Sequence, residues 1–337
     1  MIPNIQTQPL PVQFYSHVAF DGDRSVWVHR GSNAMTTVDW STPQPRAQTF
    51  SWGDDDARPL AHDLLPLGEG RWAIHTLTGH HDDGGYDLWV MDFDQLPEGD
   101  QQEPWRCPRF YSNPVALDGR IIARRGVPGR GTELVEVVPG VGERVVHEAM
   151  DRRPVGFSVV PLPEGRRGLW WGGDVFVLEG DRLTRAWPLE AGQRATCRRM
   201  GEPHAHSAIP GPDGSLYALY NTGSRLHQGG EVFAMAPDKV TRRRVSTPSM
   251  PRMEGMLALP DGAFLGVIVE RTKYAMIWFL EERKSISLTA KALGMNDLFI
   301  GGVWWSEASR CLYVNHSSRL LRIAWDDLKG YRRRAMR

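Results

Sequence analysis

Three side chains that can bind a metal ion or move a proton precede a glycine turn by the same distance. His62, His206 and Glu254 each stand eight residues before a glycine, in the segments HDLLPLGEG, HSAIPGPDG and EGMLALPDG. Imidazole nitrogen and carboxylate oxygen suit zinc, manganese or magnesium, and a histidine near neutral pH can also accept or donate a proton. The shared spacing predicts a catalytic or divalent-metal site built from these three residues, with the choice among Mg, Mn and Zn left open.

Eight further residues are candidates for ligand binding. Matching FYSHVAFDG with FYSNPVALDG aligns His17 with Asn113, at the place that His62 occupies in its own segment. The remaining candidates end apolar runs or lie in the loops that follow: His75, Asn221, His227, Glu270, Arg271 and His316. Each histidine can instead be a structural group that hydrogen-bonds a neighbouring strand, and the sequence leaves that alternative open.

The turn glycines belong to a long internal repeat. A turn followed by a β-branched and aromatic run recurs with steps of 48, 49, 46, 49, 48 and 47 residues. A fixed period of this length is typical of repeat architectures. The repeated positions are Gly22, Gly70, Gly119, Gly165, Gly214, Gly262 and, in the seventh place, Ser309.

Each repeat contains three short apolar runs and no long helical period, and in all but the last repeat a fourth, more polar run follows. The repeat around Gly70, for example, reads DLLPL, RWAIHTL and YDLWVMDF, and a more polar run follows. Four antiparallel strands per repeat are the pattern of a β-propeller blade. The sequence therefore predicts an all-β chain with a single seven-bladed β-propeller of four-stranded antiparallel blades.

The two ends of the chain indicate how such a ring would close. After Ser309 the last repeat lacks a run for its fourth strand, whereas residues 6–14 precede the first repeat at the place of one. We expect this N-terminal strand to pair with the last blade, which removes an open sheet edge. The predicted propeller spans residues 1–328, and the predicted remainder is a basic, solvated tail at 329–337.

Propeller geometry would bring the candidate residues to one face. In this arrangement the first strand of each blade lines the central channel, and its beginning lies on the same face as the end of the second strand. Ten of the eleven histidines then fall on that face, and His147 is the exception. The expected site is a central pocket lined by histidine and glutamate.

Composition limits the classes of partner. Forty basic residues balance forty acidic ones, so no net charge favours nucleic acid or a membrane surface. The three cysteines are odd in number and widely spaced, which argues against a disulfide framework. The first residues show no signal-peptide pattern. We expect a cytoplasmic monomer that binds neither nucleic acid nor membrane.

The segments IPGPDGSLYALY and ALPDGAFLGVIV resemble the repeats of streptogramin-lyase, NHL and gluconolactonase-like propellers. The resemblance rests on a turn-plus-strand motif shared by all seven repeats. Similarity to the streptogramin lyases implies seven blades and a metal-assisted elimination that opens a cyclic ester with a histidine. On that basis His206 would be the base, and Glu254 would lie near the metal. Gluconolactonase-like enzymes have six blades, which counts against them.

The sequence is compatible with two functions. The first is a metal-assisted lyase or hydrolase that acts on a small or cyclic ligand in the pocket. The second is a non-catalytic scaffold that docks a peptide or a partner protein on the same face, which the mixed charge of the loops favours.

Overall fold

The computed structural model describes most of the chain. The described residues are 1–12, 15–30, 34–42, 44–51, 60–77, 86–94, 105–107, 112–127, 131–138, 140–150, 157–162, 166–171, 174–187, 205–211, 216–224, 227–235, 242–244, 253–269, 273–279, 284–295, 300–316 and 319–335. They fall into two compact units. The first unit comprises Met1–Pro9, Pro154–Val177 and Thr184–Arg337, and the second comprises Leu10–Arg153 and Leu178–Leu183.

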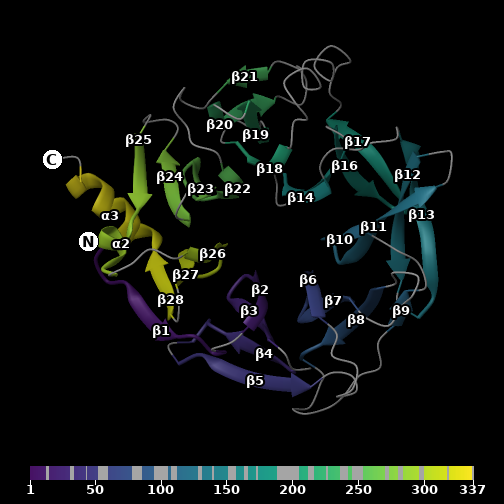
Figure 1. The fold of residues 1–337 in the computed structure, drawn as a ribbon, viewed down its shortest axis with the longest axis horizontal. Coiled ribbons are helices and arrows are strands. Elements are labelled where there is room, and N and C mark those ends of the chain that lie inside the picture. Colours follow the sequence, from purple (N-terminus) through teal and green to yellow (C-terminus); the bar gives the residue numbers. More distant parts are fainter. Residues whose placement is uncertain are drawn as a thin grey trace. The chain divides into compact units, whose positions relative to one another are not determined.

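The described strands form seven four-stranded sheets, and the strand pairs are antiparallel (Figure 1). The second unit holds three complete sheets, which follow one another along the chain. These are β2 (Tyr15–Asp21), β3 (Arg24–His29), β4 (Ala34–Asp39) and β5 (Arg46–Ser51); β6 (Leu60–Gly68), β7 (Arg71–Leu77), β8 (Tyr86–Asp92) and β9 (Trp105–Cys107); and β10 (Ser112–Leu117), β11 (Arg120–Val127), β12 (Gly131–Val138) and β13 (Gly142–Met150).

The fourth sheet belongs mainly to the first unit, which also holds the last three sheets and the described helices. The fourth sheet is β14 (Phe157–Pro161), β15 (Arg167–Trp171), β16 (Asp174–Glu179) and β17 (Arg182–Trp187). The others are β18 (Ala205–Pro210), β19 (Leu216–Ser224), β20 (His227–Met235) and β21 (Arg242–Arg244); β22 (Met253–Ala258), β23 (Ala263–Val269), β24 (Lys273–Phe279) and β25 (Lys284–Leu288); and β26 (Ile300–Ser306), β27 (Cys311–His316), β28 (Arg319–Ala324) and β1 (Gln6–Pro9). The helices are α2 (Ala290–Leu293) and α3 (Trp325–Ala335).

The repeated acid–glycine pairs form the tight turns between first and second strands. Asp118 and Gly119 have φ of 49° and 76°, and Asp261 and Gly262 have φ of 58° and 67°. Two consecutive positive φ values are characteristic of the type I′ turn that matches the twist of a β-hairpin. The repeat that the sequence predicts is therefore a repeat of this hairpin.

The N-terminal strand pairs as predicted, over a shorter length. Strand β1 covers Gln6–Pro9 and lies antiparallel to β28, with Gln6 opposite Arg322 and Pro9 opposite Arg319. A second proline follows at position 11, and proline lacks the N–H that would extend the ladder. The last sheet thus obtains its fourth strand from the beginning of the chain.

Apolar side chains between neighbouring sheets form the core of each unit. In the second unit Val26, Ile74 and Met91 are buried together. In the first unit Leu265, Leu312 and Leu321 belong to a larger cluster. Each fully buried side chain of this size contributes about 1.5–3 kcal/mol relative to exposure.

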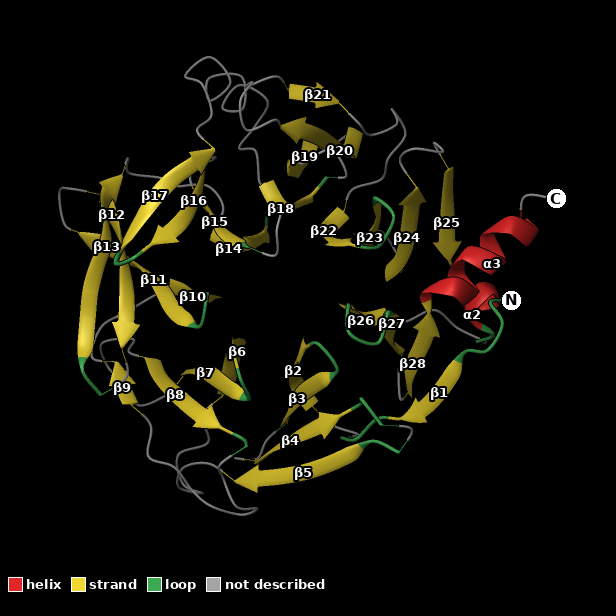
Figure 2. Ribbon diagram, turned by 180° about the vertical axis from the view of Figure 1, so that it is seen from behind, coloured by secondary structure: helices red, strands yellow, loops and turns green. Residues whose placement is uncertain are grey.

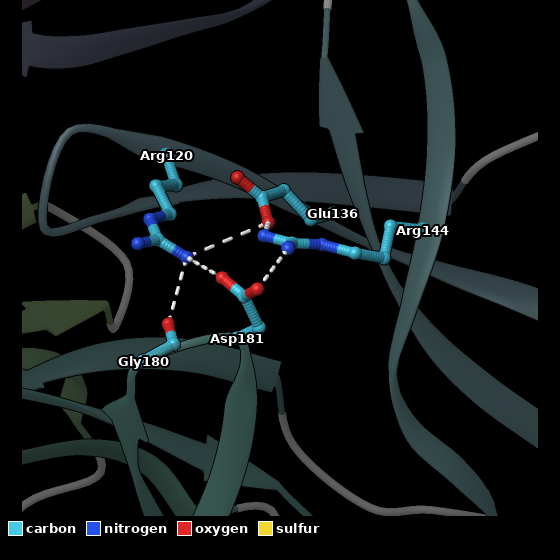
Figure 3. Close-up of polar contacts among 5 residues, drawn as sticks. All are labelled: Arg120, Glu136, Arg144, Gly180 and Asp181. Carbon is cyan, nitrogen blue, oxygen red and sulfur yellow. Dashed lines mark hydrogen bonds and ion pairs between the residues drawn. The ribbon is translucent and has the colours of Figure 1, made fainter.

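Polar contacts join successive sheets within the second unit (Figure 3). Arg120, at the start of β11, donates to the backbone oxygen of Gly180 at 2.9 Å and lies 3.6 Å from Asp181. Arg144 on β13 binds the other oxygen of Asp181 at 2.6 Å and also pairs with Glu136. Hydrogen bonding to Glu136 raises the pKa of Arg144. The turn after β16 is thereby held against the preceding sheet.

The same arrangement occurs once more in the second unit. Arg24 begins β3, and its Nη1 lies 2.8 Å from Oδ1 of Asp94, which follows β8. In both cases an arginine that begins a second strand binds the acid that follows the third strand of the next sheet. The basic residue after the hairpin turn in these repeats therefore has a structural role.

The C-terminal segment differs from the solvated tail expected from residue 329. Helix α3 runs through Ala335 (Figure 2). Trp325 and Leu328 are buried in the core of the first unit. Lys329 forms an ion pair with Asp261 and lies 5.7 Å from the ring of Trp325. Apolar residues on one side of the helix anchor it, so residue 328 is not the end of the folded body.

Asp261 should make part of the stability depend on pH. Hydrogen bonds from Lys329 and Trp325 lower the pKa of Asp261, so the unfolded chain takes up this proton more readily than the folded one. The contribution of ionised Asp261 to the free energy of unfolding is therefore complete above the ordinary carboxyl pKa. It is lost as the pH falls below about 4. We expect Asp261→Asn to be less stable than the wild type at neutral pH and equal to it in acid. Urea unfolding across this pH range measures the effect. A difference in the free energy of unfolding between the two proteins that stays constant with pH would contradict it.

Candidate functional site

The first strands share a local irregularity close to where each begins. In six of the seven described sheets, the first strand has one residue more than the second strand opposite it, which is a β-bulge. Strand β14 pairs with β15 without a shift, from Phe157 opposite Trp171 onward. The extra residues, called the bulge positions below, are Ser16, His62, Asn113 with Pro114, His206, Glu254 and Gly301.

All three residues predicted to act on a metal or a proton occupy bulge positions. In β6, Ala61 pairs with Thr76 and Asp63 with His75, which leaves His62 as the extra residue. The register shifts around His206 in β18 and Glu254 in β22 are equivalent. Bulges are enriched beside active sites, where they redirect a side chain. The spacing of eight residues to the turn glycine is thus the length of a hairpin strand plus its bulge.

Adjacent strands bring some of these positions together within each unit. In the first unit, β18 lies beside β22, so that His206 and Glu254 occupy equivalent places on neighbouring strands. In the second unit, β6 lies between β2 and β10, which carry Ser16 and Asn113. The side chains of His62, His206 and Glu254 are not among those that the structure describes. Among the described residues there is no cluster of three metal-binding groups.

Several predicted ligand-binding residues lie beside the bulges. His17 follows the bulge in β2, and Asn113 is part of the bulge in β10. His75 on β7 is only 3% exposed and pairs with Asp63, next to His62. His316 ends β27 opposite Ile300, which precedes the bulge at Gly301. His17 thus lies one residue beyond the bulge position that its match with Asn113 predicted, and the roles of these residues in ligand binding stay predictions.

Other predicted residues lie farther from the bulges along their strands, or outside the described residues. Asn221 lies within β19, opposite Gly230. His227, expected in a loop, is the first residue of β20 and pairs with Ser224, because β19 and β20 extend further than the apolar pattern indicates. Glu270 and Arg271 lie outside the described residues.

His29, which lies near a bulge, differs in surroundings from a solvated imidazole. His29 ends β3 opposite Tyr15, and its Nε2 lies 2.8 Å from Oγ1 of Thr36, which in turn lies 3.0 Å from Oγ1 of Thr49. Burial lowers the pKa of His29, which favours the neutral ring. A neutral imidazole can bind a metal or accept a proton.

Two further polar residues lie at this end of the hairpins, and sequence reasoning missed one of them, Arg124. Asn315 on β27 is 1% exposed and pairs with Gly302, directly after the bulge at Gly301. Arg124 on β11 pairs with Ser112, directly before the bulge at Asn113. Both lie on second strands opposite a residue that flanks a bulge, as His29 and His75 do, so that position within the repeat was the available signal.

Comparison with known proteins identifies the fold. No protein-family model and no curated protein matches the chain. A virginiamycin B lyase from Staphylococcus aureus, solved with quinupristin as a catalytically inactive histidine-to-alanine variant, is 10% identical with a TM-score of 0.57. The match covers 95% of this chain and 98% of that one. The chain has the β-propeller fold.

Propellers without a stated catalytic role match at similar or somewhat lower TM-scores. YCF48 bound to the D1 peptide is 11% identical, with a TM-score of 0.55, and the match covers 95% of this chain and 96% of that one. The WD40 propeller of Doa1 is 11% identical, with a TM-score of 0.50 and the same coverage. Fold similarity at this level does not select a function. No described helix combines the length and apolar character needed to span a bilayer.

Proposed function

We propose that the seven sheets close into one ring, completed by β1, and that the bulge positions line a central pocket on one face. In this propeller the pocket binds a small or cyclic ligand. His206, Glu254 and His62 hold a divalent cation there, and the protein acts as a metal-assisted lyase or hydrolase. The observation that supports the proposal is the coincidence of all three residues with bulge positions.

The donor set fits such a cation. Two imidazoles and one carboxylate are common ligands of zinc and manganese, and a carboxylate also suits magnesium. The cation, when bound, would polarise a carbonyl of the ligand as a Lewis acid. His206 and Glu254, on the adjacent strands β18 and β22, would supply two of the ligands from the first unit.

Alternatively, the three residues would act on a proton without a bound cation. His206, as a neutral imidazole, would then remove a proton from the bound ligand in an elimination, or from water in a hydrolysis. Glu254 would stabilise the imidazolium that results. A carboxylate that loses hydration in a pocket is costly without a cationic partner, which either a metal or an imidazolium would provide.

The alternative is a scaffold that docks a peptide or a partner protein at the same face. The neighbour solved with the D1 peptide favours it. The nearly complete burial of His75 and Asn315 also favours it, because buried polar groups of this kind commonly serve structure rather than catalysis. In this alternative the bulges shape the docking surface and no cation is needed.

Metal binding distinguishes the two functions. We expect the purified protein to bind one Mn²⁺, Zn²⁺ or Mg²⁺ ion per chain in equilibrium dialysis, and His206→Ala to abolish this binding. His147→Ala is the matched control, because His147 lies on β13, away from the bulge positions, and its loss should leave metal binding unchanged. A wild type that binds no ion, or a His206→Ala variant that binds as well as the wild type, would refute the metal-assisted function and leave the scaffold.

A further inference from the structure

We infer that Arg71 binds a carboxylate supplied by a partner protein, on a surface of the second unit that is separate from the proposed pocket. Arg71 begins β7, next to the hairpin turn, whereas the bulge at His62 lies at the other end of the same hairpin. The partner segment that fits this surface is acidic and has apolar side chains beside its acid. The inference goes beyond the proposed function. It is carried by an acid that the second and fourth sheets contain and the third sheet lacks.

The second unit has three described arginines that begin second strands, and two of them have an acidic partner in the next sheet. The three are Arg24, Arg71 and Arg120. Arg24 lies 2.8 Å from Asp94, which follows β8. Arg120 lies 3.6 Å from Asp181, which follows β16 (Figure 3). The side chain of Arg71 is exposed, and no described residue forms an ion pair or a hydrogen bond with it.

The third sheet has no acid at the place where Arg71 would find one. Strand β8 ends at Asp92, and Asp94 is the second residue after this end. Strand β12 ends at Val138, and the second residue after this end is Gly140. A Cβ atom at Gly140 would meet no described atom within 4 Å. The turn after β12 therefore offers room for a carboxylate but does not supply one.

Arg71 nevertheless extends toward the third sheet, as Arg24 extends toward the second. A Cβ atom at Gly70 would lie 2.9 Å from Nη1 of Arg24 and would overlap the carboxylate of Asp94, so this ion pair covers the turn glycine. A Cβ atom at Gly119 would lie 3.8 Å from Nη2 of Arg71, with no carboxylate of a described residue within 4 Å. The guanidinium of Arg71 is thus placed for an acid that this part of the chain does not provide.

The acids closest to Arg71 along the chain do not take this role. Asp92 lies opposite Arg71 in the register, and its Oδ1 accepts a hydrogen bond of 3.1 Å from the backbone N–H of Asp94. Asp118 is exposed in the turn beside Gly119, and no ion pair joins it to Arg71. A planar guanidinium can donate two parallel hydrogen bonds to one carboxylate. An acid from another protein would therefore complete the arrangement that Arg24 and Asp94 complete within the chain.

Exposed valines beside the same turn favour a protein partner over a small anion. The large apolar side chains that the structure describes as exposed are those of Met1, Val141 and Val145. Val141 is 83% exposed and directly follows Gly140, and Val145 is 43% exposed on β13. Covering such side chains stabilises a complex in proportion to the apolar area that is buried. A peptide segment with an acid and apolar neighbours can do this, whereas an inorganic anion cannot.

Fluorescence anisotropy with a labelled short peptide of alternating aspartate and valine tests the inference on the full-length protein. We expect the wild type to bind this peptide more tightly than the matching peptide of alternating asparagine and valine. Arg71→Gln should weaken binding of the acidic peptide by about fivefold, the upper end of what one exposed ion pair contributes. Arg24→Gln is the matched control and should leave this binding unchanged, because Arg24 already has Asp94 as its partner.

An acid introduced into the chain should block the surface. Gly140→Asp places a carboxylate where Asp94 stands in the second sheet, and aspartate and asparagine tolerate positive φ better than other side chains do. Gly140→Asp should weaken peptide binding as much as Arg71→Gln does. Gly140→Asn, which has the same size and no charge, should bind the peptide as the wild type does.

Four outcomes would overturn the inference. The first is a wild type that binds both peptides equally, and the second is an Arg71→Gln variant that binds the acidic peptide as well as the wild type does. The third is displacement of the peptide by an equal concentration of inorganic phosphate, which would assign Arg71 to a phosphate group. The fourth is self-association in size-exclusion chromatography that Arg71→Gln abolishes, which would assign the surface to a second copy of this chain.

Discussion

Deletion of residues 1–9 should severely destabilise the protein and promote its aggregation. The deletion removes β1, which supplies the fourth strand of the last sheet, and also Ile2, which is 2% exposed in the core of the first unit. Loss of a buried isoleucine side chain alone costs about 2–5 kcal/mol. Strand β28, with Leu320 and Leu321, would then become an open sheet edge, which templates association between chains.

Urea unfolding with size-exclusion chromatography measures both effects. Ile2→Val is the graded control and should cost only about 0.5–1.5 kcal/mol, because it removes a single methylene. A synthetic peptide of residues 1–12, added to the truncated protein, should restore the unfolding midpoint by occupying the vacant edge. A truncated protein that is monomeric and as stable as the full chain would show that β1 has no role in completing the fold.

The second large effect concerns two histidines that lie far apart in the sequence. His62 belongs to the second unit and His206 to the first. If both bind one cation, His62→Ala and His206→Ala should each weaken Zn²⁺ binding by about 100-fold or more, since even indirect partners of a metal contribute 10–100-fold. Their effects should not add, because the second substitution acts on a site that the first has already disrupted. A coupling energy of about 0.5–3 kcal/mol is usual for residues that share a site.

A double-mutant cycle on Zn²⁺ affinity provides this measurement. His147→Ala combined with either variant is the control, and its effects should add within error. Additive effects of His62→Ala and His206→Ala would mean that the two histidines serve separate sites, and the central pocket would lose its support.

The sequence predicted the strands well because their signals are local. Acid–glycine pairs such as Asp118–Gly119 define hairpin turns through their positive φ, and the apolar runs between them pair antiparallel. The pairing of β1 with β28 was also predictable, since the last repeat lacked one run and the N-terminus supplied it. The C-terminal part of helix α3 was missed, because its basic residues suggested a solvated tail. Trp325 and Leu328 indicate that one side of the helix is buried.

For the candidate site, the sequence could predict only that the candidate residues occupy equivalent positions in their repeats. The common spacing of His62, His206 and Glu254 predicted equivalent positions, and the register shows that these positions are bulges. A bulge leaves no local signal, because it depends on how many residues the opposite strand contributes. Arg124 escaped prediction for a related reason, since its place beside a bulge follows from pairing with Ser112 and not from a motif.

A crystal of the protein grown with Mn²⁺ tests the central claim most directly. The anomalous-difference map should show a single strong peak bounded by the side chains of His62, His206 and Glu254. A peak elsewhere, or a map in which these three side chains do not face one common space, would contradict the claim that the bulge positions of both units form one site.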